Sequence, residues 1–230
     1  MKKMFAVFAV AAFATTAAAQ AGGSMAGMNM EATKKIAQVG SHPDGWLMRN
    51  DNPADKPGDD NFTTMGPGMH VESGPAAIYW NPANTASGAY TVSATFGVRS
   101  IPLHDAIGLV WGGNDLGGDK VSYGYFLVYG NGTFAVKHRS GPSTGGKNNP
   151  DVHTVVATAP NTAINAAPAN GGAASNKLAV KVAADSVRFY VNDVQVAAVD
   201  AKNPMMPTSG IYGFRVNHNI SVHVADLAKQ

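Results

Sequence analysis

The side chains in this sequence that are best suited to chemistry are aromatic and planar polar groups of the kind that contact sugars. An aromatic ring covers the apolar face of a sugar, while a guanidinium or an imidazole hydrogen-bonds its hydroxyls. Arg139 leads among the polar candidates, because it ends an alternating segment beside a Ser-Gly-Pro turn, where its donor fork can reach a ligand. The alternatives are a rim salt bridge for Arg139 and a place in the core for each tryptophan. The candidate ligand-binding residues are Trp80, Trp111, Tyr123, Tyr125, His138, Arg139 and Arg215.

The glycine-rich segment 112–119 carries the candidate metal ligands Asn114, Asp115 and Asp119. Calcium accepts about 6–8 oxygen ligands from carboxylates and carbonyls, and a flexible polar turn can supply them. The alternative is an ordinary polar turn. Zinc is not favoured, because the chain has no cysteine and because His218 and His223, an odd number of positions apart, would point to opposite faces of a regular strand.

The elements that must position these groups are strands. From Gly45 onward apolar residues recur with period two, as over 90–98 and 187–191, whereas both faces of the segment 123–129 are apolar. Gly130-Asn131-Gly132 is a hairpin signal. About a dozen such segments, separated by Gly, Asn, Asp or Pro, predict an all-β sandwich of two antiparallel sheets in one domain, 40–230.

Two segments interrupt this alternation. The segment 50–61 contains two prolines and four aspartates, among them the neighbours Asp59 and Asp60, and predicts a solvated loop. The segment 161–176 is rich in Ala, Asn and Gly, which favours a surface excursion between strands.

The first forty residues predict the destination of the protein. Lys2 and Lys3, an apolar run over 4–13 and Ala17-Ala18-Ala19 indicate a signal peptide, 1–19, followed by a flexible leader, 20–39. We therefore expect a periplasmic or secreted protein that is not inserted in a membrane after cleavage. Without Lys2 and Lys3 the basic and acidic residues balance, so nucleic acid is not an expected partner.

Several segments together resemble the concanavalin A-like jelly roll, in its laminin-G-like branch. The hairpin segment Val187–Asp193 is similar to the Phe-Tyr-Val-Asn-Gly hairpin of these domains, with Asp193 where Gly is usual. A weaker resemblance extends to the keto-glycoside hydrolase or lyase domains of the same fold. The resemblance implies a two-sheet antiparallel jelly roll, and laminin-G-like domains often carry calcium at a rim loop. The other segments that carry it are Gly45-Trp46, Gly74–Trp80, Ser87–Tyr90, Gly108–Gly113, Tyr125–Val128, Asn131–Phe134 and Gly210–Arg215.

The function favoured by these residues is non-catalytic binding of a glycan or a cell-envelope component. A retaining glucanase of this fold needs two carboxylates about 5–5.5 Å apart, yet the only glutamates, Glu31 and Glu72, are far apart in the sequence. A first alternative is a hydrolase or lyase that acts on a modified keto-glycoside, as the weaker resemblance implies. A second alternative is an exported structural protein that assembles through its sheet edges. The candidate titratable residues for an enzyme are His104, Asp105, Asp115 and His138.

Overall fold

Alternating apolar residues form fourteen β-strands and one short 3-10 turn, Pro57–Asp59, across the described residues 33–39, 42–142 and 150–230 of the computed structural model. The predicted signal peptide and residues 20–32 of the predicted leader lie outside these ranges. Residues Thr33–Gln230 belong to one compact unit. Among the described residues no helix has the length and apolar character needed to cross a membrane.

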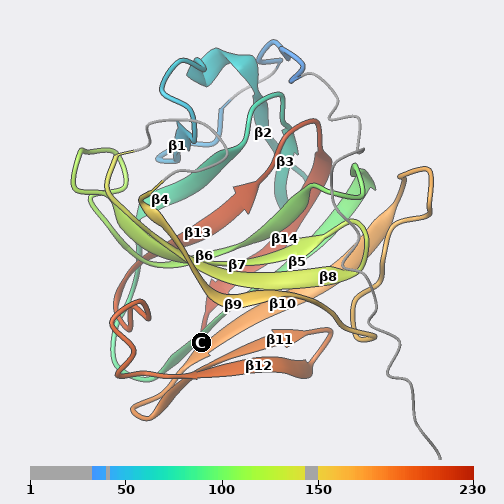
Figure 1. Cartoon of the computed structure of the whole chain (residues 1–230). Helices are drawn as coiled ribbons and strands as arrows, with labels where there is room; N and C mark the ends of the chain where they lie inside the picture. The colour runs from blue at the N-terminus through green and yellow to red at the C-terminus, as the bar shows by residue number, and fades with distance from the viewer. Residues whose placement is uncertain (1–32, 40–41, 143–149) are drawn as a thin grey trace, which may run out of the picture. The chain divides into compact units, whose positions relative to one another are not determined.

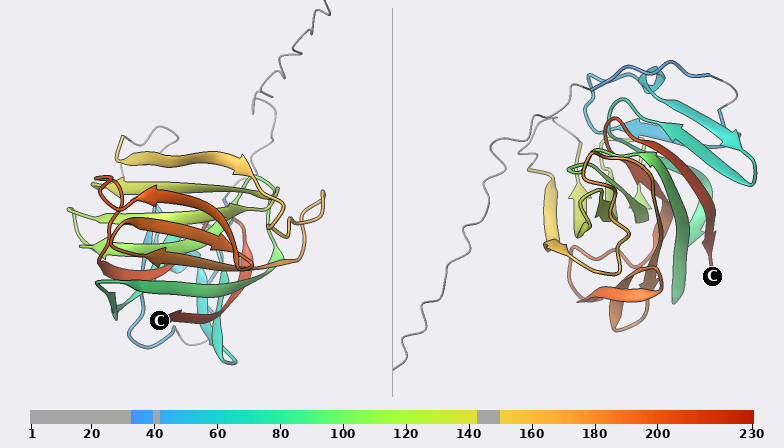
Figure 2. Two further views of the ribbon diagram at one scale, coloured as in Figure 1. Left: turned by 90° about the horizontal axis from the view of Figure 1, so that it is seen from below. Right: turned by 90° about the vertical axis from the view of Figure 1, so that its right-hand side faces the viewer.

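The strands form two seven-stranded sheets in which every neighbouring pair is antiparallel (Figures 1 and 2). The predicted two-sheet antiparallel jelly-roll sandwich is therefore confirmed. The first sheet has the order β1 (Leu47–Asn50), β4 (Ala77–Ala86), β13 (Gly210–Val216), β6 (Ala106–Asn114), β7 (Ser122–Tyr129), β8 (Thr133–Ser140) and β9 (Val152–Pro160). The second sheet has the order β12 (Val194–Asp200), β11 (Ser186–Val191), β10 (Ala174–Val182), β5 (Tyr90–Ser100), β14 (Ser221–Lys229), β3 (Gly68–Glu72) and β2 (Asn61–Met65).

The main core lies between the two sheets and follows the period-two pattern. On β5, Tyr90, Val92, Ala94, Phe96 and Val98 are buried, and the residues between them are partly exposed. Successive side chains of a strand point to opposite faces, so this alternation turns one face of β5 toward the first sheet.

An aromatic group closes one part of this core. Tyr79 of β4 and Phe214 of β13 stack with their ring centroids 5.0 Å apart, and Phe62 of β2 meets Tyr79 edge-on at 4.8 Å. Trp46, which precedes β1, packs against Phe62 at 5.8 Å and Phe214 at 5.6 Å. Rings from both sheets therefore meet in one contact group.

The first sheet is apolar on both faces. On β7, Phe126 and Val128 join the inter-sheet core, whereas Tyr123, Tyr125 and Leu127 belong to a second buried cluster on the outer face. The other buried members of the outer cluster are Ile78, Trp80, Ala106, Val110, Leu116 and Val121. A sheet with two covered faces can hold polar groups in a largely dry environment on the side away from the core.

The two segments that interrupt the alternation are less solvated than predicted. In segment 50–61, Asn50 and Asp60 are buried, with Asp60 completely inaccessible, so the solvated-loop prediction is wrong for these residues. The Gly74 amide donates to the Oδ1 of Asp60 at 2.7 Å, which explains how the carboxyl is accommodated. In segment 161–176, Ile164 and Ala167 pack into the core, so this excursion covers one end of the sandwich.

Candidate functional site

The outer face of the first sheet has a narrow strip of small residues along β6. Its outward positions are Ala106, Gly108 and Val110, and Gly108 is the register partner of Arg215 on β13. A Cβ atom at Gly108 would clash with the Phe126 carbonyl oxygen of β7, so this position requires glycine. The Arg215 Cζ lies 5.2 Å from the centre of the Tyr125 ring. This distance is within the range of a cation–π contact.

Asp51, directly after β1, is hydrogen-bonded to two arginines on this face. Arg215 Nη1 donates to Asp51 Oδ1 at 2.7 Å, and Arg215 Nη2 donates to the other carboxylate oxygen. Arg139 Nη1 on β8 donates to the same Oδ1 at 3.1 Å and lies 3.5 Å from the Tyr123 hydroxyl. We call Asp51, Arg139, Arg215, Tyr123 and Tyr125 the Asp51 cluster.

The charges of the Asp51 cluster are largely removed from water. Arg139 is 3% exposed and Arg215 is 6% exposed, whereas 35% of the Asp51 side chain is exposed. Burial alone would raise the pKa of Asp51, but the attraction of Arg215 and Arg139 outweighs it and holds this pKa below its usual value. Asp51 is therefore ionised at neutral pH, and its carboxylate is the most accessible charge of the cluster.

A second polar group lies beside the Asp51 cluster. Asp105, buried just before β6, accepts a hydrogen bond from His218 Nδ1 at 2.9 Å, and its other oxygen lies 3.4 Å from His104 Nε2. This bond is the main reason that the pKa of His218 is raised. The two groups are connected through Asn217, the neighbour of His218, whose side-chain oxygen accepts from Arg215 Nε at 3.1 Å.

The accessible groups of this face are polar and surround the buried ones. The His218 side chain is 39% exposed and that of His104 is 22% exposed. Tyr129 of β7 and Lys137 of β8 are partly exposed. The buried Arg139 and Arg215 keep Asp51 in place by hydrogen bonds. A ligand on this face would therefore meet the more accessible side chains of Asp51, Lys137, Tyr129, His104 and His218. We call these five residues the accessible rim.

Five of the seven predicted ligand-binding residues lie on this face, and all five are nearly buried. Trp80 is 4% exposed and packs in the outer apolar cluster beside Leu116 of the β6–β7 loop. Arg49 of β1 fastens that loop by donating to the carbonyls of Leu116 at 3.1 Å and Gly118 at 2.6 Å. The five are Trp80, Tyr123, Tyr125, Arg139 and Arg215.

The other two predicted residues, Trp111 and His138, lie on the inner face. Trp111 is inaccessible, contacts Phe189 of the second sheet at 5.3 Å and donates from Nε1 to the Pro207 carbonyl at 2.9 Å. His138 is 7% exposed, and its Nε2 lies 3.2 Å from Ser122 Oγ. Both belong to the inner positions of their strands, so the structure places them away from the outer face, and we remove them from the candidate site.

The predicted metal segment is a turn closed by its own carboxylate. Asp115 Oδ2 accepts the Lys120 amide at 2.8 Å, and the Asp115 carboxylate packs against Gly118. Asn114 and Asp119 are largely exposed. Within the described ranges no three His, Cys, Asp or Glu side chains gather in a metal-binding group. Asp115 thus serves the turn, and calcium at this segment stays a prediction.

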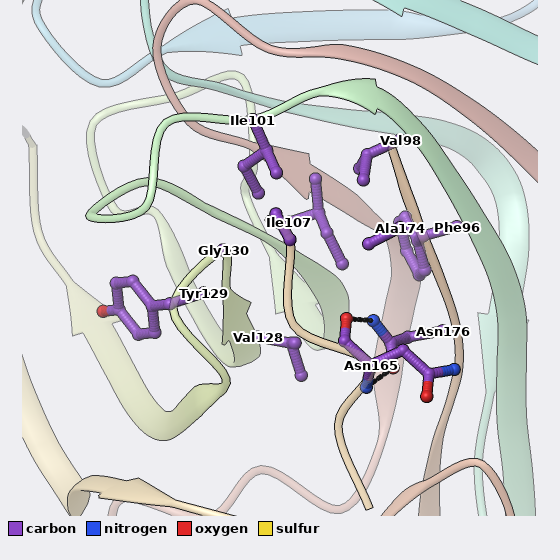
Figure 3. Close-up of a pocket in the computed structure, with 11 residues that line it drawn as sticks. Phe96, Val98, Ile101, Ile107, Val128, Tyr129, Gly130, Asn165, Ala174 and Asn176 are labelled. Atoms are coloured by element: carbon purple, nitrogen blue, oxygen red, sulfur yellow. Dashed lines mark hydrogen bonds between the residues drawn. The ribbon is translucent and has the colours of Figure 1, made fainter. Parts of the chain in front are cut away.

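A small cavity between the sheets is not a ligand site. It has a volume of about 10 Å³ and is lined mainly by apolar side chains, with Asn165 and Asn176 at one end (Figure 3). Such a volume is about that of one water molecule. The two asparagines hydrogen-bond each other, at 2.8 and 3.0 Å, and the Tyr129 ring extends away from the other lining side chains (Figure 3).

Comparisons with known proteins bear on the fold. No family model matches the sequence, and no curated protein matches it. Among solved structures, the carbohydrate-binding module CBM66 from Bacillus subtilis has a TM-score of 0.56 at 13% identity, over 84% of this chain and 99% of the module. A protein with a galectin-like fold, also from Bacillus subtilis, has a TM-score of 0.54 at 13% identity, over 80% and 88% of the two chains.

The similarity also includes an enzyme fold. A GH16 protein of the mixed-linkage glucan locus of Bacteroides ovatus, solved with a glucan product, has a TM-score of 0.50 at 8% identity, over 84% and 96% of the two chains. At these identities the likeness shows the fold alone, a two-sheet antiparallel jelly roll, and the concanavalin A-like assignment stays a prediction. The narrower laminin-G-like assignment stays a prediction.

Four residues of the site, Asp51, Tyr129, Lys137 and His218, were missed or valued for another reason. Asp51 has no distinguishing signal, because it stands in a segment with three other aspartates. Lys137 could have been found, since it is two positions from Arg139 on one strand and must share its face. His218 was considered only as a zinc ligand, and nothing in its neighbours indicates the contact with Asp105, 113 positions away.

Proposed function

We propose that this protein binds a carbohydrate on the outer face of the first sheet, over the Asp51 cluster and its accessible rim. The observation that carries the proposal is the two-bond ion pair of Asp51 and Arg215, in which a buried guanidinium holds a partly exposed carboxylate on a sheet face that points away from the core. Desolvating such charges is costly, and perturbed charged groups of this kind concentrate at functional sites. Carboxylates, imidazoles and phenol rings are also groups that hydrogen-bond and stack with sugars.

Two of the structural neighbours support the carbohydrate class. One is described as a carbohydrate-binding module and another is described with a glucan product. Their likeness to this chain concerns the fold, so the proposal depends on the residues of the site rather than on the neighbours. A cell-envelope glycan and a periplasmic or secreted location agree with the predicted signal peptide and form part of the proposal. Fractionation of the producing cell tests the location.

The test of binding uses Tyr129 and His218 of the accessible rim. Neither belongs to the Asp51 cluster, so their replacement leaves that cluster in place. Tyr129→Ala and His218→Ala are each expected to weaken binding to the best glycan of an array by about tenfold, measured by calorimetry. Tyr190→Ala is the matched control, since Tyr190 is also a partly exposed strand tyrosine but lies on β11 of the second sheet. The proposal fails if no glycan binds, or if the Tyr190 variant loses affinity and the rim variants do not.

A second candidate function is acid–base catalysis on a glycoside, favoured by the bond between buried Asp105 and exposed His218. A carboxylate that fixes one ring nitrogen leaves the other free to exchange a proton with a substrate. Of the predicted catalytic residues the structure brings His104 and Asp105 together, whereas Asp115 and His138 lie elsewhere. Turnover of a keto-glycoside or a plain glycoside that falls at least about a hundredfold in His218→Gln would favour the enzyme, since general acid–base groups contribute about 10²–10⁴-fold.

A further inference from the structure

Lys137 is a charged side chain on the outer face that forms no ion pair with any of the described residues. It lies on β8 directly opposite Tyr125 of β7, and it is partly buried. In the described part of the chain no hydrogen bond or ion pair involves its ammonium group. Lys177 on the second sheet shows the usual arrangement, since its Nζ lies 2.9 Å from Asp193 Oδ1.

The charges around Lys137 are unbalanced. Arg139, Arg215 and Lys137 carry three positive charges on this face, and Asp51 supplies one negative charge to them. The neighbouring pair of Asp105 and His218 neutralises itself when the imidazole is protonated. The face therefore keeps an excess of positive charge around Asp51 and Lys137.

The surroundings of Lys137 disfavour its charged form. Burial is the largest cause that lowers its pKa, and the positive charge of Arg215 lowers it further, while Asp51 acts in the opposite sense. Arg139 also has unpartnered donors on this face. Its Nε and Nη2 are buried and have no hydrogen-bond partner among the described residues. A negative group placed beside Lys137 would relieve the repulsion between the cations.

We propose that the carbohydrate bound on this face is acidic, and that its anionic group, a carboxylate or a sulfate, lies beside Lys137. This inference rests on the proposed function and names the class of sugar. The anion pairs with the Lys137 ammonium, and Tyr129 and His218 contact the rest of the sugar. A neutral sugar would leave the excess positive charge uncompensated when water is displaced from the face.

The experiment compares polymers that differ in charge alone. Polygalacturonate is paired with its fully methyl-esterified form, and a sulfated galactan is paired with its desulfated form, so that the two arms separate carboxylate from sulfate. We expect one acidic polymer to bind at least about tenfold more tightly than its neutral partner, with an affinity that falls as salt is raised from about 0.05 to about 0.5 M. Binding is measured by calorimetry and by affinity electrophoresis.

Variants of two lysines assign the effect to this face. Lys137→Met retains the aliphatic stem and removes the charge, and we expect it to weaken acidic-polymer binding about fivefold to tenfold, more than it weakens neutral-polymer binding. Lys181→Met is the matched control, because Lys181 is an exposed strand lysine on β10 of the second sheet. Thermal unfolding of both variants tests whether the fold is retained.

The outcomes separate this inference from the proposed function. If the neutral polymers bind as tightly as the acidic ones, or if Lys137→Met and Lys181→Met behave alike, the inference is overturned and carbohydrate binding stands. If neither these polymers nor any glycan of the array binds, both are overturned.

Discussion

Arg215 of β13 donates hydrogen bonds to both carboxylate oxygens of Asp51, a residue 164 positions away in the sequence and directly after β1. Neither residue lies between the two sheets, so the pair does not contribute to the hydrophobic core. It instead holds the segment after β1 against the outer face of the first sheet. This pair gives the first of four predictions about stability and protonation; the others concern Asp60, two histidines and Gly124.

Removing the Asp51 carboxylate should cost more stability than removing an exposed one. Asp51→Asn leaves Arg139 and Arg215 buried without a countercharge, and we expect the free energy of unfolding to fall by about 2–4 kcal/mol, less than for a fully buried pair because Asp51 is partly exposed. Denaturant unfolding measures the change. Asp193→Asn is the control, because its pair with Lys177 is exposed, and it should cost less than about 1 kcal/mol. Equal losses would contradict the interpretation.

Asp60 should make the protein less stable as the pH rises. Burial raises the pKa of Asp60 to about 7, above its usual value of 3.8. The folded protein therefore holds this proton more tightly than the unfolded chain, so its contribution is complete below about pH 4 and is lost as the pH rises through about 7. Asp60→Asn mimics the protonated acid and should be stabilised relative to the parent by about 1–3 kcal/mol more at pH 8 than at pH 5. Denaturant unfolding at both pH values tests this, and a difference that does not depend on pH would exclude a buried protonated Asp60.

His218 and His70 should titrate on opposite sides of the ordinary histidine value. The hydrogen bond to Asp105 raises the pKa of His218 above 6.5, whereas burial lowers that of His70. The stabilisation from His218 is present below about pH 6.5 and is lost as the pH rises through its raised pKa. NMR titration of the imidazole signals reports both residues in one spectrum, and Asp105→Asn should return only His218 toward 6.5. A His218 that titrates below His70 would contradict the proposed contact.

Gly124 on β7 should tolerate no side chain. A Cβ atom at this position would lie 2.5 Å from Cζ2 of Trp111, so Gly124→Ala forces the indole or the strand to move. We expect a loss of about 1–3 kcal/mol in the free energy of unfolding and a changed near-UV circular dichroism spectrum. Gly97→Ala on β5 is the control, because the nearest atom to its added Cβ is 3.9 Å away, and it should be close to neutral.

The sequence predicts the strands well because their signal is local. Alternation on β5 and β10 identifies the face that packs against the first sheet, and the Gly130-Asn131-Gly132 turn joins β7 to β8 as predicted. The pattern does not reveal which face of β6 or β7 is the inner one, because both faces of these strands are apolar. The first four residues of β4 are also apolar and buried, so Trp80 of β4 and Trp111 of β6 look equivalent in the sequence, although Trp80 lies on the outer face and Trp111 lies in the core.

The site itself depends on contacts between distant segments. Arg139 and Arg215 are identified from their residue type and their place at strand ends, but their shared partner Asp51 is indistinguishable from Asp55 or Asp59 in its segment. The same limit applies to Asp105 and His218, which meet only because β6 and β13 are neighbours in the sheet. Pairing order is a property of the folded sheet, and no periodicity along the chain encodes it.

The pairing of Asp51 with Arg215 also affects the order of events during synthesis on the ribosome. The tyrosines of β7 and the lysine of β8 leave the exit tunnel long before β13 does, so a nascent or prematurely terminated chain presents aromatic rings without the guanidinium that fixes Asp51. The arrangement around Asp51 is therefore complete only after the thirteenth strand has joined the first sheet.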